Sequence, residues 1–145
     1  ILYWKKKTTN QNNITFHGFV APHKVSSYQI SCDILLAPYQ NKVNVSSKSD
    51  ISTEKWMSPL KIFEYMAANR SIICSDIPVL REVLVNGYNC ILCKNDDMDS
   101  WILALKKLKN DHAFRNLISN NAYQDFKDRY SWDSRAESII KNLNL

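Results

Sequence analysis

Two charged side chains one helical turn apart, Lys61 and Glu64, have the types and spacing that could do chemistry. They lie in residues 58–69, where Ser58 suits a helix N-cap and Pro59 suits the first helical position. The free N–H groups at a helix start and the positive end of the helix dipole favour phosphate. Lys61 would add a positive charge in that turn, and the Glu64 carboxylate could accept two hydroxyls, as a ribose presents them. This combination indicates a nucleotide-like ligand.

A purely structural interpretation competes with this one. At i,i+3 spacing Lys61 and Glu64 also suit a surface pair worth about 0.2–0.5 kcal/mol. Glu82 is likewise typical of a helix surface, and His17 beside Gly18 is more typical of a packed histidine than of a base. The sequence has no G-x-S-x-G turn and no paired-carboxylate spacing, which argues against a hydrolase.

The elements that must position these residues alternate along the chain. Apolar runs predict strands over 14–17, 33–37, 71–75 and 88–93, and helical spacing predicts helices over 23–31, 58–69 and 78–85. The alternation predicts an α/β fold, a Rossmann-like parallel sheet with helices on both faces. The remainder is expected to be a helical C-terminal end, with helices over 99–108, 113–126 and 131–143. In the last helix, apolar residues recur at strict helical spacing: Trp132, Ala136, Ile139, Ile140 and Leu143.

In an open parallel sheet, ligands bind beyond the carboxyl ends of the strands, near helix starts. Three segments are therefore expected to converge on one site: residues 18–20, residues 38–39 with the segment that follows, and residues 57–61. Residues 39–57 have no usable periodicity, and a segment of this length in a compact domain is expected to be functional or mobile.

Composition bounds the class of protein. The 145 residues suit one domain, and 45% hydrophobic content excludes a disordered chain. With only two glycines, the chain has no glycine-rich nucleotide loop. No apolar run approaches the roughly 20 residues that a membrane span needs, and no signal peptide is visible. Because the chain begins with Ile1 inside an apparent element, we expect an N-terminally truncated piece of a longer protein.

The charge and the cysteines narrow the partners. The net charge of +5 is consistent with a solvated surface, a phosphate-bearing ligand or an anionic membrane surface. The sequence lacks the stripe of basic and aromatic residues that is typical of a nucleic-acid-binding protein. Cys32 and Cys74 lie in apolar contexts and are expected in the core. Cys90 and Cys93 have C-x-x-C spacing, but the chain has no second pair, so a metal site is not expected. We expect the cysteines to be reduced thiols in the cytoplasm.

Three motifs carry a resemblance to a known family: N-I-T-F-H-G-F-V at 13–20, S-C-D-I-L-L-A-P-Y at 31–39, and S-P-L-K-I-F-E-Y-M-A-A-N-R-S-I-I-C-S-D-I-P-V-L-R-E-V-L at 58–84. The chain resembles the carboxyl-terminal, donor-binding domain of glycosyltransferases group 1, the family-four retaining enzymes of the two-domain GT-B fold. The resemblance extends through the helix at Tyr130-Ser131-Trp132 and so covers essentially the whole chain.

The resemblance implies that residues 1–145 form a single nucleotide-sugar-binding domain of a retaining glycosyltransferase, without the acceptor domain. Glu64 would hold the donor ribose, the segment entering the helix would approach the diphosphate and sugar, and residues 18–20 would border the nucleobase. The implied donor-binding residues are Ser58, Pro59, Leu60, Lys61, Glu64, Gly18, Phe19, Val20 and Tyr39. Catalysis is expected without a cofactor or an obligatory divalent ion.

The resemblance also implies partners beyond the donor. These are a glycan or lipid-linked acceptor, the missing amino-terminal domain and a peripheral membrane contact at the inner face, in bacterial surface polysaccharide synthesis. One departure favours an alternative. The family has two acids separated by seven residues, and Trp56 stands at the first position, with Glu54 two residues out of register. The alternative is a non-catalytic module of the same fold that binds protein or a membrane surface.

Overall fold

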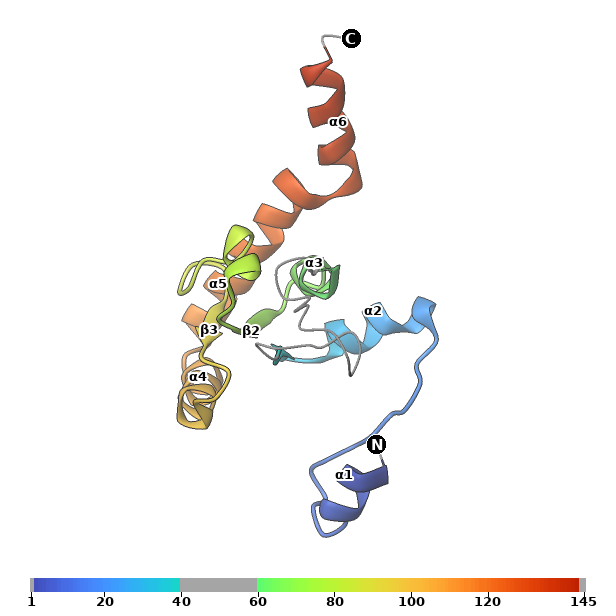
Figure 1. Cartoon of the computed structure of the whole chain (residues 1–145), viewed down its shortest axis with the longest axis vertical. Coiled ribbons are helices and arrows are strands. Elements are labelled where there is room, and N and C mark those ends of the chain that lie inside the picture. The colour runs from blue at the N-terminus through green and yellow to red at the C-terminus, as the bar shows by residue number, and fades with distance from the viewer. Residues whose placement is uncertain (1, 40–59, 144–145) are drawn as a thin grey trace, which may run out of the picture.

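A parallel sheet lies at the centre of the computed structural model, which describes residues 2–39 and 60–143 (Figure 1). Its three strands are β1 (Ile34–Ala37), β2 (Ser71–Ser75) and β3 (Ile91–Cys93), in the order β1-β2-β3. In the register of the pairs, Ile34 faces Ser71 and Ile73 faces Ile91. The predicted α/β class is confirmed.

The helices account for most of the remaining described residues. They are α1 (Leu2–Lys7), α2 (Pro22–Ser31), α3 (Leu60–Ala67), α4 (Met98–Asn110), α5 (His112–Asp125) and α6 (Trp132–Asn142), with a 3-10 turn η2 (Pro78–Glu82) and a π-helical turn η3 (Phe126–Tyr130). Ser131 caps α6, because its Oγ accepts the N–H of Ser134 at 3.1 Å. No helix in the described part of the chain is long and apolar enough to cross a membrane.

The central strand explains why helices cover both faces. All five residues of β2 are buried. Because side chains alternate along a strand, neighbouring residues enter different cores. One core contains Ile72, Cys74, Ile62, Met66, Leu80, Cys90 and Ala122. The other contains Ile73, Cys93, Ala104, Leu108 and Ile118. The sheet therefore carries α3 on one side and α4 on the other, as the apolar runs predicted.

Residues 14–17 form no strand, contrary to the prediction. They belong to an irregular stretch between α1 and α2 that runs apart from the sheet (Figure 1). A strand is stable only when its backbone pairs with a neighbour, and within the described residues β1 pairs with β2 alone. Ile14 is exposed there, so the alternating apolar side chains do not pack against a core.

The helix predicted over 78–85 is only the 3-10 turn η2. The buried side chain of Asn89 explains why the helix does not continue. Its Oδ1 accepts the N–H of Val85 at 2.8 Å, and its Nδ2 donates to the carbonyl of Val83 at 3.1 Å. These bonds satisfy backbone groups that a longer helix would pair internally, and the chain turns at Gly87, where φ is +78°.

The last predicted helix is present as α6, but its apolar residues are not buried within the described part of the chain. Helix α6 projects from the body of the domain (Figure 1) and none of its residues is buried. Trp132 is 86% exposed, and Ile139 and Ile140 are exposed as well. Helical periodicity identifies an apolar face but not the surface that covers it. Cys32 is also exposed rather than in the core, whereas Cys74, Cys90 and Cys93 are buried.

We expect the core of α4 to respond sharply to truncation. Leu108 is fully buried, and Leu103 on the same helix is 65% exposed. Leu108→Ala should lower the free energy of unfolding by about 2–5 kcal/mol, because it leaves a cavity. Leu103→Ala, the matched control, should change it by less than about 1 kcal/mol. Urea denaturation followed by circular dichroism measures both, and equal effects would contradict the assigned faces of α4.

Candidate functional site

The end of β1 and the start of α3 lie beside each other at the carboxyl edge of the sheet. The Nζ of Lys61 is 5.7 Å from the centroid of the Tyr39 ring, which is within the range of a cation–π contact. Tyr39 follows β1 after Pro38, and Lys61 is the second residue of α3. The parallel topology therefore brings together an aromatic ring and a cation where the sheet ends.

The backbone of Tyr39 is held by side chains from the other two strands. The Ser75 hydroxyl at the end of β2 accepts the Tyr39 N–H at 2.8 Å and donates to the Tyr39 carbonyl at 2.9 Å. The Nδ2 of Asn95, two residues after β3, donates to the same carbonyl at 2.7 Å. Ser75 is fully buried. The segment leaving β1 is thus fixed at both backbone groups of one residue.

The Tyr39 side chain is half-buried, and burial raises the pKa of its phenol above the ordinary value of 10.0. The nearby groups Cys74, Tyr65 and Glu64 raise the pKa further through unfavourable charge interactions. The phenol therefore stays protonated and neutral at physiological pH. It can line a site and donate a hydrogen bond, but it does not act as a base there.

Glu64 lies on the exposed side of α3 and meets α2. The Nε2 of Gln29 donates to Oε2 of Glu64 at 3.2 Å. The other oxygen, Oε1, has no hydrogen-bond partner among residues 2–39 and 60–143. One carboxylate oxygen is thus anchored, and the other is available to accept a hydroxyl.

Lys61 and Glu64 do not form the surface ion pair that their spacing allowed. The ion pairs within the described residues are Arg81 with Asp76 and Arg115 with Asp33. At the same edge of the sheet, Arg81 donates two bonds to Asp76, at 2.6 and 2.7 Å. The guanidinium lowers the pKa of the Asp76 carboxyl below its ordinary 3.8. Arg81 is therefore already engaged, whereas Lys61 leans over an aromatic ring and keeps its charge available.

The segment Gly18–Val20 precedes α2, and its residues Gly18 and Phe19 are exposed, whereas Val20 is half-buried. Gly18 has a φ of +72°, which favours glycine, and Phe19 is 91% exposed. The ring of the preceding His17 lies edge-on to that of Tyr28 at 4.8 Å between centroids, but His17 is exposed rather than packed in a core. The structure gives Gly18–Val20 no bond or ring contact with Tyr39, Lys61 or Glu64. Of the expected convergence, it therefore brings together the end of β1 and the start of α3.

Two expected residues, Ser58 and Pro59, lie outside the described residues, as does most of the segment 39–57. Leu60 begins α3 and is 65% exposed. The described part of the site is thus the pair Tyr39 and Lys61, with Leu60 and Glu64 on the same helix.

Sequence reasoning missed Ser75, Asn95 and Gln29. Ser75 ends an apolar run and Asn95 follows the next one, so polar residues at the carboxyl ends of strands were a usable signal. Gln29 had no such signal. It is one of several polar residues on α2, and its partner lies 35 positions further along the chain.

An apolar groove adjoins the site along α3, with a volume of about 510 Å³. It runs between α3 and the segment that leads into α6, and its lining residues are Leu60, Phe63, Glu64, Ala67, Phe126, Tyr130, Trp132 and Arg135. Within it, the ring centroids of Phe63 and Tyr130 lie 5.1 Å apart. Leu60 and Glu64 thus belong both to the groove and to the site.

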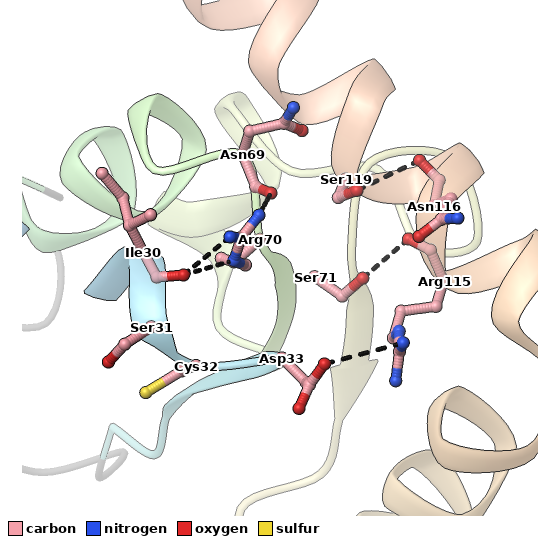
Figure 2. Close-up of a pocket in the computed structure, with 10 residues that line it drawn as sticks. All are labelled: Ile30, Ser31, Cys32, Asp33, Asn69, Arg70, Ser71, Arg115, Asn116 and Ser119. Atoms are coloured by element: carbon pink, nitrogen blue, oxygen red, sulfur yellow. Dashed lines mark hydrogen bonds and ion pairs between the residues drawn. The ribbon is translucent and has the colours of Figure 1, made fainter. Parts of the chain in front are cut away.

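A second hollow, of about 150 Å³, lies at the opposite edge of the sheet (Figure 2). Its arginines are engaged by the protein itself. Arg70 donates through Nε and Nη2 to the carbonyl of Ile30, at 2.9 and 2.6 Å. Arg115 pairs with Asp33 at 3.6 Å. Because these charges are used within the fold, the hollow is a joint between elements rather than a second anion site.

Metal-ligating residues do not gather in the described residues: no group of three or more His, Cys, Asp or Glu side chains is placed to hold an ion. Burial raises the pKa of the Cys74 thiol to about 12, so this free thiol stays protonated at physiological pH. The positive charge that the described site offers to an anionic ligand comes from the Lys61 side chain.

Comparison with known proteins identifies a family for most of the chain. Residues 2–125 match the family described as Glycosyl transferases group 1. An uncharacterized glycosyltransferase of Methanocaldococcus jannaschii is 33% identical over 132 residues, which cover 90% of this chain and 30% of the relative. The O-antigen chain mannosyltransferase RfbU of Salmonella typhimurium is 34% identical over 76 residues, 52% of this chain and 20% of that protein.

A solved structure shares the fold. Anabaena HepE, in complex with UDP-glucose, superposes with a TM-score of 0.74 at 15% identity and covers 99% of this chain. The match spans 36% of the HepE chain. The present chain thus spans about a third of the length of the M. jannaschii relative and of HepE.

We expect the Ser75 hydroxyl to control the order of the Tyr39 backbone. Ser75→Ala should lower the free energy of unfolding by about 1–3 kcal/mol, because it leaves a backbone N–H without its partner. Amide hydrogen exchange at Tyr39 should accelerate as well. Ser119→Ala is the matched control, since that buried hydroxyl bonds only its own helix, at the Asn116 carbonyl. Unchanged exchange at Tyr39 in Ser75→Ala would contradict the assigned role.

Proposed function

The chain belongs to the glycosyl transferases group 1, and from that premise we propose that it is the donor-binding domain of a retaining glycosyltransferase. The enzyme would transfer a hexose from a nucleotide-diphosphate sugar to a glycan or lipid-linked acceptor. The observation that carries the proposal is the pairing of Tyr39 with Lys61, one helical turn from Glu64, at the carboxyl edge of a parallel sheet. Ligands of open α/β sheets bind at this edge.

The roles of the residues follow from their chemistry. Lys61, in the first turn of α3, would neutralise the diphosphate, and the free N–H groups of a helix start suit the same anion. The unpartnered oxygen of Glu64 would accept a ribose hydroxyl. Tyr39 would line the donor cleft, and Gly18–Val20 would border the nucleobase. HepE was solved with UDP-glucose, which supports a nucleotide-sugar ligand for this fold.

The proposed leaving group is a nucleoside diphosphate, whose departing charge requires positive groups. In the proposed mechanism, cationic side chains such as Lys61 stabilise this charge. The proposed transfer therefore has no obligatory divalent ion or other cofactor. Because the chain spans about a third of the length of its relatives, we propose that other parts of the enzyme complete the diphosphate site. The isolated 145-residue chain would therefore bind the donor weakly and turn nothing over.

The acceptor side of the proposal rests on the relatives. RfbU is named as an O-antigen chain mannosyltransferase, which supports surface polysaccharide synthesis as the setting. The proposed partners are a glycan or lipid-linked acceptor and an amino-terminal acceptor domain. The net charge of +5 supports a peripheral contact with an anionic membrane face on the cytoplasmic side.

A second candidate is a non-catalytic module of the same fold that binds a protein or a membrane surface. Trp56, where the family has its first acid, favours it, although this position lies outside the described residues. The exposed apolar residues of α6 favour it as well, because such faces mark contact surfaces.

Glu64→Ala tests the first proposal by calorimetric titration with UDP- and GDP-sugars. The chain should bind one class of donor, and the variant should weaken that binding about tenfold, since it loses a charged hydrogen-bond acceptor. Glu82→Ala, which removes an exposed glutamate from η2, is the matched control and should bind as the unaltered chain does.

Absence of heat with every donor, or equal affinities for the Glu64 and Glu82 variants, would contradict donor binding at this site. In the full-length protein, glycan synthesis that survives Glu64→Ala would instead support the non-catalytic module.

A further inference from the structure

The contact between Gln29 and Glu64 joins two helices that the chain places far apart. Gln29 lies near the end of α2 and is half-buried, whereas Glu64 is exposed in the middle of α3. The 3.2 Å from Nε2 to Oε2 is within the range of an N–H···O bond. Among the described residues Gln29 is the hydrogen-bond partner of this carboxylate, because Lys61 leans toward Tyr39 instead.

The end of α2 that carries Gln29 is braced. Arg70, just after α3, donates two bonds to the carbonyl of Ile30, the residue next to Gln29 (Figure 2). Its Nη1 also donates to the carbonyl of Asn69 at 2.9 Å. A guanidinium on the last carbonyls of a helix complements the negative end of the helix dipole. The backbone of Gln29 is thereby held against the end of α3, so its amide reaches Glu64 from a fixed point.

A neutral amide is suited to this position. It orients the carboxylate by occupying one oxygen, and it leaves the negative charge intact for a ligand. A lysine or arginine partner would offset that charge, and an exposed glutamate without a partner would sample several rotamers. The bond from Gln29 therefore leaves Oε1 of Glu64 both charged and directed.

We propose that Gln29 is a positioning residue that directs Oε1 of Glu64 toward a ribose hydroxyl and so sets a preference for ribonucleotides over deoxyribonucleotides. This inference rests on the proposed function, since it assumes that a nucleotide donor binds beside Glu64. It adds a residue of α2 to the site and assigns it an effect on one part of the ligand, the sugar hydroxyls.

The test measures binding of UDP and GDP to the 145-residue chain and compares the tighter of the two with its 2′-deoxy and 3′-deoxy counterparts. The unaltered chain should prefer the ribonucleotide about tenfold over at least one deoxy form, the ratio expected for one hydrogen bond. Gln29→Met keeps the length of the side chain but removes its donor. It should reduce the preference to about threefold or less and leave the affinity for the deoxy form unchanged.

Two further variants separate positioning from a general structural effect. Gln29→Lys restores an N–H donor of similar reach but offsets the charge of Glu64, so its preference should lie between that of Gln29→Met and that of the unaltered chain. Gln124→Met is the matched control, because Gln124 is also a helical glutamine whose amide donates to a carboxylate, that of Asp128 at 2.9 Å, on another element. It should leave the preference unchanged.

The contact between Gln29 and Glu64 can also be tested without ligand and without the Gln29→Met variant. In a ¹H–¹⁵N spectrum, Glu64→Ala should shift the side-chain amide signals of Gln29 and leave those of Gln124 in place. If the Gln29 signals do not move, the contact is absent and the inference is overturned.

The outcomes distinguish this inference from the proposed function. A preference that Glu64→Ala abolishes and Gln29→Met retains overturns the positioning role alone. A chain that binds neither UDP nor GDP, or whose preference survives Glu64→Ala, overturns the proposed function and the positioning role with it. Loss of the preference in both Glu64→Ala and Gln29→Met, with partial retention in Gln29→Lys and full retention in Gln124→Met, supports both.

Discussion

The site depends on one buried hydroxyl. Ser75 both accepts the N–H and donates to the carbonyl of Tyr39, and so ties the chain leaving β1 to the end of β2. A polar group in such a core is stable only when its hydrogen bonds are made, and here the hydroxyl and the backbone satisfy each other. Asn95 adds the segment after β3 to the same carbonyl. The carboxyl ends of three strands are thereby joined at one residue, and its ring meets Lys61.

The two opposite edges of the sheet differ in whether their charged side chains are paired within the protein. At the amino edge, Arg70 and Arg115 donate to protein carbonyls or pair with Asp33, so their charges are used within the fold. At the carboxyl edge, Arg81 is paired with Asp76, but Lys61 and one oxygen of Glu64 are not paired within the described residues. Unpaired charge at the edge where parallel sheets bind ligands is what separates a candidate site from a structural joint.

Much of this fold could be predicted because burial on both faces leaves a direct pattern. The run Ser71–Ser75 is apolar apart from its ends, and the helix around Phe63 has one apolar face, so the strand and helix are readable from local sequence. The strand expected at 14–17 shows the limit of that pattern. Alternating apolar residues identify a face that could be buried. The segment becomes a strand only when its backbone pairs with a neighbouring strand. The exposed Trp132 of α6 shows the same limit for a helix.

The candidate site divides in a similar way. Lys61, Glu64 and Tyr39 could be selected from residue type and position, because helix starts and strand ends have known tendencies. The bonds that orient them could not. Ser75 reaches Tyr39 across 36 positions, and Gln29 reaches Glu64 across 35. Such contacts follow from how α2, α3 and the strands pack, and no local pattern encodes them.

The central claim, that a nucleotide binds at the carboxyl edge, is tested most directly by titrating UDP and GDP into the ¹⁵N-labelled chain. The account predicts that one of the two shifts the backbone amide signals of Tyr39, Lys61 and Glu64 in a saturable way and leaves those of Arg70 and Arg115 unchanged. Shifts confined to Arg70 and Arg115, or no shift with either diphosphate, would contradict it.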